Sequence, residues 1–281
     1  MYVVTGGSGF LGRAVVRMLA DAGQPVMRIA RRDVAAEQGV IDLRVAGYHD
    51  LPHSMASSIL IHAGEPADIA AAEAAGEEHI RLVCGFMDTL LARGFARLVY
   101  ISSAAVYGDE ILSPRRPDEP IAPRGIYANG KAACEAQALA RGGVVARLSN
   151  LFGPGMARNT LIADVLAQIP GHGPLQLRDD APVRDYVWIE DAARAIVACA
   201  TLPVSGILNI GSAIGTSAGT LARIALGLAG EAERPVIATA ASSRVSHLVL
   251  DITQTQEKLS WTPRMSLAGG LSQISKLKSA A

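Results

Sequence analysis

Short apolar runs alternate with alanine-rich stretches through the first half of the chain. The apolar runs predict strands at residues 2–5, 25–30, 41–45, 58–62, 97–102 and 144–148, and the stretches between them predict helices at 11–22, 67–93 and 127–141. Because the expected strands are apolar nearly throughout, they should be buried on both faces of a parallel sheet. Residues 1–150 are therefore expected to form one α/β domain built of βαβ units.

Beyond residue 150 the chain is interrupted by glycine and proline, as in Phe152-Gly-Pro-Gly155. We expect residues 151–186 and 212–281 to form a second, smaller lobe. Between them, residues 187–211 are expected to return to the first domain, with Asp191 as the N-cap of a helix and a short strand at 207–211. The predicted architecture is a doubly wound parallel sheet with a small discontinuous C-terminal lobe.

Composition and charge exclude several classes of protein. Half of the residues are hydrophobic but only 4% are aromatic, so the core should consist mainly of Ala, Val, Leu and Ile. The formal net charge is zero and no basic stretch is interleaved with aromatic residues, which argues against a nucleic-acid partner. No run of about 18 apolar residues predicts a membrane span, and the six histidines lack metal-ligand spacing, so no metal site is expected.

The cysteines and the N-terminus indicate the compartment. Cys84, Cys134 and Cys199 are widely separated and odd in number, which predicts buried free thiols in a reducing environment. Residues 1–5 have the pattern of a first strand rather than of a signal peptide. The sequence therefore predicts a cytoplasmic protein.

A glycine-rich segment connects the first expected strand to the first expected helix. It contains Gly6, Gly9 and Gly12, with Phe10 and Leu11 between the last two glycines. Such a turn lets the backbone approach a dinucleotide pyrophosphate, and the start of the helix offers unpaired N–H groups to its charge. We therefore predict that this segment binds NAD or NADP.

The end of the second expected strand bears on which dinucleotide is bound. Ala30 is followed by Arg31 and Arg32, and a small residue before arginine slightly favours the 2′-phosphate of NADP. The alternative is that both arginines are solvated and that Asp33 binds the ribose hydroxyls. The sequence leaves both possibilities open.

Tyr127 and Lys131 form a candidate proton-transfer pair. They lie one helical turn apart and would share a helix face. At an effective dielectric constant of about 20, an ammonium about 4 Å from a phenol stabilises the phenolate by about 4 kcal/mol. Ser103, at the end of an expected strand, could donate a hydrogen bond to a substrate oxygen. Gly130 weakens the helix by roughly 1 kcal/mol relative to alanine, so the geometry of the pair depends on the tertiary structure.

Taken in order, the motifs resemble those of the extended short-chain dehydrogenase/reductases, specifically the NAD-dependent epimerase/dehydratase family that acts on nucleotide sugars. The resemblance covers nearly the whole chain and implies a Rossmann-like fold. The matching segments are residues 5–12, 62–64, 100–108, 147–154, 184–191, 209–212 and 259–263, together with Tyr127 and Lys131.

The resemblance implies a role for each matched position. Ser103, Tyr127 and Lys131 would be the catalytic residues, and Ala63 and Gly64 would line the cofactor. The implied substrate-binding residues are Ser103 for the sugar, Asn150, Arg184 and Arg244 for the diphosphate, and Asn159 and Leu161 for the nucleotide. For Arg184 an alternative is a plain surface ion pair with Asp185.

These residues together predict reversible hydride transfer on a nucleotide-sugar substrate, and a nucleotide-sugar 4-epimerase is the expected enzyme. An NADPH-dependent nucleotide 4-keto-6-deoxysugar reductase is the alternative that Ala30 and Arg31 favour, and a non-catalytic NAD(P)-binding redox sensor is a third. A dehydratase is not expected, because Ala104 and Ala105 stand where that subgroup carries an acid and a base. The resemblance also implies a homodimer formed through helices near 75–93 and 127–141.

Overall fold

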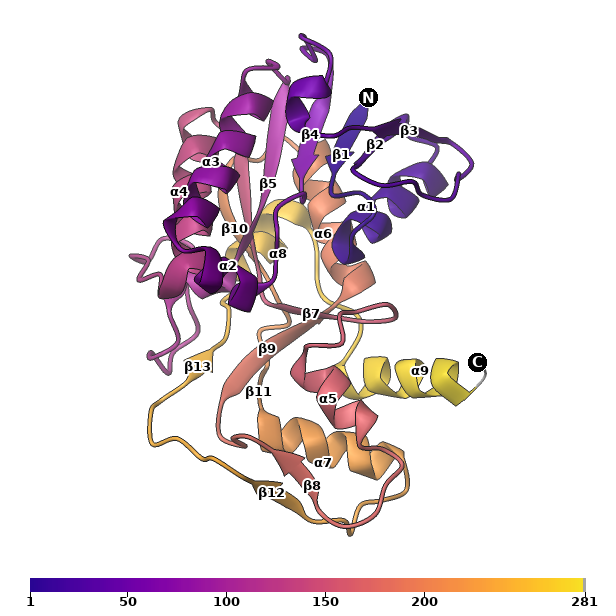
Figure 1. Ribbon diagram of the computed structural model, residues 1–281, viewed down its shortest axis with the longest axis vertical. Helices are drawn as coiled ribbons and strands as arrows, with labels where there is room; N and C mark the ends of the chain where they lie inside the picture. The colour runs from indigo at the N-terminus through magenta and orange to yellow at the C-terminus, as the bar shows by residue number, and fades with distance from the viewer. Residues whose placement is uncertain (280–281) are drawn as a thin grey trace.

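A computed structural model describes residues 1–279 of the chain, and within them a seven-stranded parallel sheet forms the larger lobe (Figure 1). Its strands are β1 (Tyr2–Thr5), β2 (Val26–Ala30), β3 (Val40–Arg44), β4 (Ile59–His62), β5 (Arg97–Ser103), β6 (Val144–Leu148) and β10 (Gly206–Ile210). They lie in the order β10-β6-β5-β4-β1-β2-β3, and every neighbouring pair is parallel. The doubly wound α/β fold expected from the sequence is confirmed.

Helices cover both faces of this sheet. On one face lie α2 (Ile69–Ala75), α3 (Glu77–Leu91) and α4 (Gly125–Ala140), and on the other lie α1 (Phe10–Asp21) and α6 (Ile189–Thr201). The helical stretch predicted for residues 67–93 is two helices, because Gly76 has a φ of 58° that neither helix can include. Helix α4 begins at Gly125, two residues before its predicted start.

The second lobe is built around small sheets (Figure 1). One contains β7 (Asn150–Phe152), β9 (Val183–Trp188), β11 (Gly215–Ser217) and β13 (His247–Leu248), and another pairs β8 (Leu175–Leu177) with β12 (Val236–Ala238). The remaining helices are α5 (Leu161–Ala167), α7 (Ala218–Leu228), α8 (Thr253–Leu259) and α9 (Leu267–Ser279). Helix α8 packs against β10 and α6, which belong to the larger lobe.

The start of α6 differs from the prediction. Its N-cap is Trp188, and Asp191 lies inside the first turn with its side chain buried. The Asp191 carboxylate accepts hydrogen bonds from the backbone N–H groups of Arg264 and Met265, each at 2.8 Å, and pairs with Arg194. Asp191 is therefore a tertiary contact that anchors the segment before α9, which its place before an apolar stripe did not indicate.

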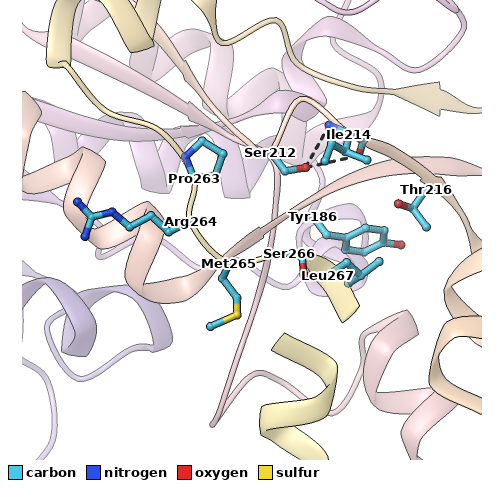
Figure 2. Close-up of a pocket in the computed structure, with 9 residues that line it drawn as sticks. All are labelled: Tyr186, Ser212, Ile214, Thr216, Pro263, Arg264, Met265, Ser266 and Leu267. Atoms are coloured by element: carbon cyan, nitrogen blue, oxygen red, sulfur yellow. Dashed lines mark hydrogen bonds between the residues drawn. The ribbon is translucent and has the colours of Figure 1, made fainter. Parts of the chain in front are cut away.

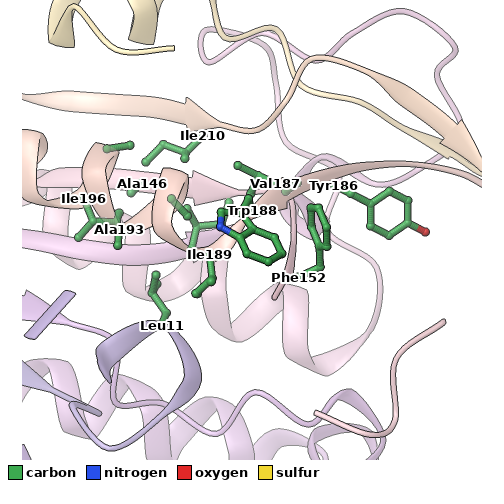
Figure 3. Packing of buried hydrophobic residues seen from close by; sticks show 14 of the residues in the cluster. Leu11, Ala146, Phe152, Tyr186, Val187, Trp188, Ile189, Ala193, Ile196 and Ile210 are labelled. Carbon is green, nitrogen blue, oxygen red and sulfur yellow. The ribbon is translucent and has the colours of Figure 1, made fainter. Parts of the chain in front are cut away.

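One apolar cluster continues from the large sheet into the second lobe (Figure 3). The rings of Phe152 and Trp188 meet edge to face at 5.2 Å between centroids, and both side chains are buried. Leu11 from α1 and Ile196 from α6 belong to the same cluster. Because the two lobes share this core, the elements that end at the sheet's carboxyl edge are held in a fixed arrangement.

The three cysteines are free, with Cys134 and Cys199 buried and Cys84 partly exposed. No helix in the described part of the chain combines the length and the apolar character that crossing a membrane requires.

Candidate functional site

The glycine-rich turn lies between β1 and α1, at the carboxyl edge of the large sheet. Gly6 has a φ of 65°, and a Cβ atom there would lie 2.3 Å from the carbonyl oxygen of Ala63. A Cβ atom on Gly12 would lie 2.1 Å from the carbonyl oxygen of Gly6. Helix α1 begins directly after Gly9, so its unpaired N–H groups and the positive end of its dipole face the turn. The turn is thus a cradle that only glycine can form, and it suits a pyrophosphate.

Strand order places this turn at the switch point of the sheet. The chain runs from β1 to β2 and β3 on one side of β1, and then crosses back to β4 on its other side. Open α/β sheets bind ligands in the crevice outside the carboxyl ends of the strands at such a point. Ala63 and Gly64 follow β4 and lie against Gly6, where they would line a bound dinucleotide.

Arg31, Arg32 and Asp33 follow β2 and are all exposed. Asp33 pairs with Arg44 at 3.0 Å, and both side chains are largely in solvent. The preceding arginine of the strand, Arg28, is instead buried and bound by Asp42 and Glu37. The two exposed arginines remain available to the 2′-phosphate of NADP. The Asp33 carboxylate, in the same short segment, is the group that would bind the ribose hydroxyls of NAD.

Tyr127 and Lys131 share one face of α4, as their spacing predicted. The Lys131 ammonium lies 5.9 Å from the centre of the Tyr127 ring. It also donates a hydrogen bond of 2.8 Å to the carbonyl oxygen of Ile101 in β5. Ser103 is the last residue of β5, two positions further along, so the structure places all three at the same end of this strand.

Gly130 does not disturb this geometry, because it lies inside the continuous helix α4. A Cβ atom on Gly130 would lie 3.3 Å from a methyl carbon of Val83 and 3.4 Å from the imidazole of His79, both on α3. The missing side chain thus lets α3 and α4 pack closely.

Glu65 is a site residue that sequence reasoning missed. Its carboxylate lies 2.7 Å from the Lys131 ammonium and accepts a 3.0 Å hydrogen bond from the Tyr100 hydroxyl. The side chain is 5% exposed, and burial alone would raise its pKa. Lys131 and His62 outweigh that effect and hold the pKa of Glu65 at about 2. The signal in the sequence was an acidic residue three positions after a buried strand that ends at the expected cofactor site.

Arg184 and Arg244, both predicted to hold a diphosphate, are brought together by Asp109. Arg184 contacts the Asp109 carboxylate at 3.1 Å, and Arg244 forms two hydrogen bonds with it at 2.7 and 2.9 Å. Ser246 donates a further one at 2.6 Å. Hydrogen bonds from Arg244 and Ser246 outweigh partial burial and lower the pKa of Asp109 to about 2. Asp109 was not among the predicted site residues.

The alternative ion pair between Arg184 and Asp185 is wrong. Asp185 points into the protein, where it is 1% exposed, and accepts hydrogen bonds from the backbone N–H groups of Ser212 and Ala213. Neighbouring residues of β9 face opposite sides of the strand, so Arg184 and Asp185 cannot pair.

The other predicted substrate residues lie on neighbouring elements of the second lobe. Asn150 begins β7 and Asn159 lies in the loop before α5, both exposed, and Leu161 is the first residue of α5. The described residues show no hydrogen bond between these three and the two arginines. Their part in substrate binding remains a prediction.

A cavity of about 210 Å³ lies beside β9 and β11 (Figure 2). Figure 2 shows the Tyr186 ring near Thr216 and Leu267, and the segment before α9 closes the opposite side. Burial raises the pKa of Tyr186 to about 12. The cavity adjoins the strand that carries Arg184 and contains none of the predicted catalytic side chains.

Comparison with known proteins gives a consistent result. The sequence model described as "NAD dependent epimerase/dehydratase family" matches residues 2–211. UDP-glucuronic acid decarboxylase 1 of Arabidopsis thaliana is 26% identical over 306 residues, covering 97% of this chain and 68% of that protein. UDP-glucose 4-epimerase of Corynebacterium glutamicum is 25% identical over 301 residues, covering 93% and 90%. The solved structure of MoeE5 in complex with UDP-glucuronic acid and NAD superposes with a TM-score of 0.85 at 23% identity, covering 100% and 99%.

Proposed function

The chain belongs to the NAD dependent epimerase/dehydratase family, and we propose that it is a nucleotide-sugar 4-epimerase that works by reversible hydride transfer with NAD or NADP. One observation carries the proposal. Tyr127 and Lys131 lie side by side on α4 at the end of the strand that finishes in Ser103, next to a glycine turn suited to a pyrophosphate. A protein that only binds a dinucleotide has no need for this arrangement.

Each residue has a separate task in this proposal. Tyr127 takes the proton from a sugar hydroxyl and later returns it, while Lys131 stabilises the phenolate electrostatically. Ser103 donates a hydrogen bond to the sugar oxygen and orients it toward the phenol. A bound nicotinamide would supply the hydride exchange at sugar C4, and inversion requires that the 4-keto sugar turn so that the hydride returns to its opposite face. Gly6, Gly9 and Gly12, with Ala63 and Gly64, would hold the dinucleotide in place for this exchange.

Arg184 and Arg244 would bind the diphosphate of the substrate, because guanidinium groups bind phosphate oxygens through paired hydrogen bonds. Their convergence on Asp109 supports this, since a carboxylate of the protein already lies between the two guanidinium groups. Asn150 would assist at the diphosphate, and Asn159 and Leu161 would contact the nucleotide. The chain has no net charge to attract the anion over a distance, so these local contacts supply the attraction.

Two other reactions of related enzymes are distinguished by particular residues. Water elimination needs proton carriers beyond Tyr127, but Ala104 and Ala105, the two residues after Ser103, offer only methyl groups. Net reduction with NADPH is the second candidate, and the exposed Arg31 and Arg32 after β2 favour it.

Two measurements test the proposal. Mass identification of the dinucleotide released by denaturing fresh protein should find retained NAD for an epimerase. A site that is empty on purification and then binds NADPH, together with net oxidation of NADPH while a 4-keto sugar is reduced, would instead establish the reductase. UDP- and dTDP-sugars are then assayed with wild type and Tyr127→Phe, which should lose about 100-fold or more of the activity. Tyr2→Phe is the control: it removes a phenol oxygen in β1 and should keep wild-type activity. Wild-type activity in Tyr127→Phe would refute the role of Tyr127.

We further propose that the protein is a homodimer formed through α3 and α4. Leu82 on α3 and Leu139 on α4 are exposed apolar side chains on these packed helices. Sedimentation analysis of wild type and a Leu82→Glu variant should show a dimer that the charge weakens.

A further inference from the structure

The buried carboxylate of Glu65 has no task in the proposed proton transfer, yet it contacts the group that would assist it. Glu65 lies three residues beyond the end of β4, and one carboxylate oxygen faces both Lys131 and Tyr100. The other oxygen lies 3.5 Å from His62 Nε2, and both of these atoms are buried without a hydrogen-bond partner. His62 is fixed in turn through a 2.6 Å hydrogen bond between its Nδ1 and the Thr5 hydroxyl.

The contacts of Lys131 determine which groups its ammonium can still bind. An ammonium has three N–H donors, and Lys131 gives one to Glu65 and one to the carbonyl oxygen of Ile101. The nitrogen also lies 5.1 Å from the Tyr100 ring centre and 5.9 Å from that of Tyr127. One donor is left for the Tyr127 hydroxyl or for a ribose hydroxyl of the dinucleotide.

A lysine enclosed in this way needs a counter-charge to stay protonated. Burial by itself lowers the pKa of Lys131, while the nearby Glu65 carboxylate raises it and is the larger of the groups acting in that direction. A fully buried lysine without a partner can have a pKa about three to five pH units below its ordinary value. The titratable groups facing the pair are His62 at the end of β4, Tyr48 between β3 and β4, Tyr100 on β5, Tyr127 and Cys134 on α4, and Cys84 on α3.

We propose that Glu65 is a positioning residue that keeps the Lys131 ammonium charged and fixed between Tyr100 and Tyr127. Lys131 then acts on the Tyr127 phenol as half of a neutral ion pair rather than as an isolated cation. The functional role of the Glu65–Lys131 ion pair rests on the proposed proton transfer. The ion pair itself does not, so its effect on Lys131 can be measured without substrate.

The chain offers a direct assay, because its sequence contains only four lysines: Lys131, Lys258, Lys276 and Lys278. Protein labelled with ¹³C at lysine Cε should therefore give four side-chain signals, and the one missing from Lys131→Met identifies Lys131. In wild type this signal should titrate above the ordinary lysine range. In Glu65→Gln, which keeps the shape of the side chain but not its charge, it should titrate at least about one pH unit lower than in wild type.

Glu78→Gln is the matched control, since it removes one carboxylate from the exposed surface of α3 and should leave the Lys131 titration unchanged. An unchanged Lys131 titration in Glu65→Gln would overturn the proposal. If Glu65→Gln does not fold, Glu65→Asp decides alone: withdrawing the carboxylate by one methylene should lower the titration by a smaller amount, and no shift overturns the proposal. The titration is measured without substrate, separately from the activity assay. A protein that shows the expected shift in the Lys131 titration but no epimerase activity would therefore refute the 4-epimerase proposal and leave the ion-pair role of Glu65 intact.

Discussion

Replacing Glu135 with glutamine should destabilise the protein strongly, because it leaves the buried Arg147 guanidinium without a counter-ion. Glu135 on α4 and Arg147 on β6 are each 2% exposed. Two hydrogen bonds of 2.9 and 2.6 Å join the guanidinium to the two carboxylate oxygens, and Ser102 of β5 donates another to Glu135. Glu135 lies one turn beyond Lys131, so this network fixes the helix that carries the proposed proton-transfer pair.

The size of the effect follows from burial. Removing one member of a buried ion pair costs about 3–5 kcal/mol, because the remaining charge has lost its partner and cannot reach water. Glutamine keeps one acceptor oxygen for Arg147 or Ser102, so we expect a loss near the lower end, about 3 kcal/mol. Domains of ordinary stability have about 5–15 kcal/mol in total, so the variant should remain folded with a clearly reduced margin.

Urea unfolding followed by tryptophan fluorescence measures this loss, because Trp188 and Trp261 are both buried in the folded protein. The double variant Glu135→Leu with Arg147→Met removes both charges and should recover much of the lost stability, since hydrophobic replacements of buried ion pairs are often neutral or stabilising. Glu78→Gln, which breaks an exposed pair with Arg81, should scarcely move the midpoint. A loss below about 1 kcal/mol, or a double variant less stable than the single one, would refute the reasoning.

Three further predictions follow from other contacts. The pKa of Glu65 is about 2 in the folded protein against 4.5 ordinarily, so its ionised form stabilises the fold above pH 4.5. That contribution, about 3 kcal/mol, should be lost as the pH falls from about 4.5 to 2, and the unfolding free energy of Glu65→Gln should vary less across this window. Asp109→Asn should bind UDP more tightly by calorimetry, because Asp109 competes for Arg184 and Arg244; weaker binding would show that the carboxylate positions them instead. Gly227→Ala in α7, where a Cβ meets open space, should raise the unfolding free energy by up to about 1 kcal/mol, and Gly130→Ala should raise it less, because its Cβ would press on Val83.

The apolar pattern alone located the strands of the large sheet and the helical stretches between them, although it did not divide α2 from α3 or give the start of α6. Strands β1 and β6 have the predicted bounds, and the other strands of the sheet differ by a residue or two. The glycine turn and the spacing of Tyr127 and Lys131 were readable for the same reason: a tight turn and a helix face depend on residues within a few positions of one another. The fold and the family were therefore accessible from the sequence.

Contacts between distant segments were not accessible in this way. Asp191 was assigned to a helix cap from its local position, but its partners lie at Arg264 and Met265. The alternative pairing of Arg184 with the adjacent Asp185 was wrong, because Arg184 pairs with Asp109, on a loop of the larger lobe. An acidic residue in a sequence shows only that a charge exists, and folding decides which cation it meets.

The same distinction applies to the proposed active site. The sequence determined that Tyr127 and Lys131 would share a helix face, because helical geometry is local. Only the tertiary structure decided that Lys131 would be buried, and that a carboxylate from the end of another strand would lie 2.7 Å from it. Burial removes water from around the ammonium, so its charge depends on neighbours brought together by the sheet, which no spacing along the chain can specify.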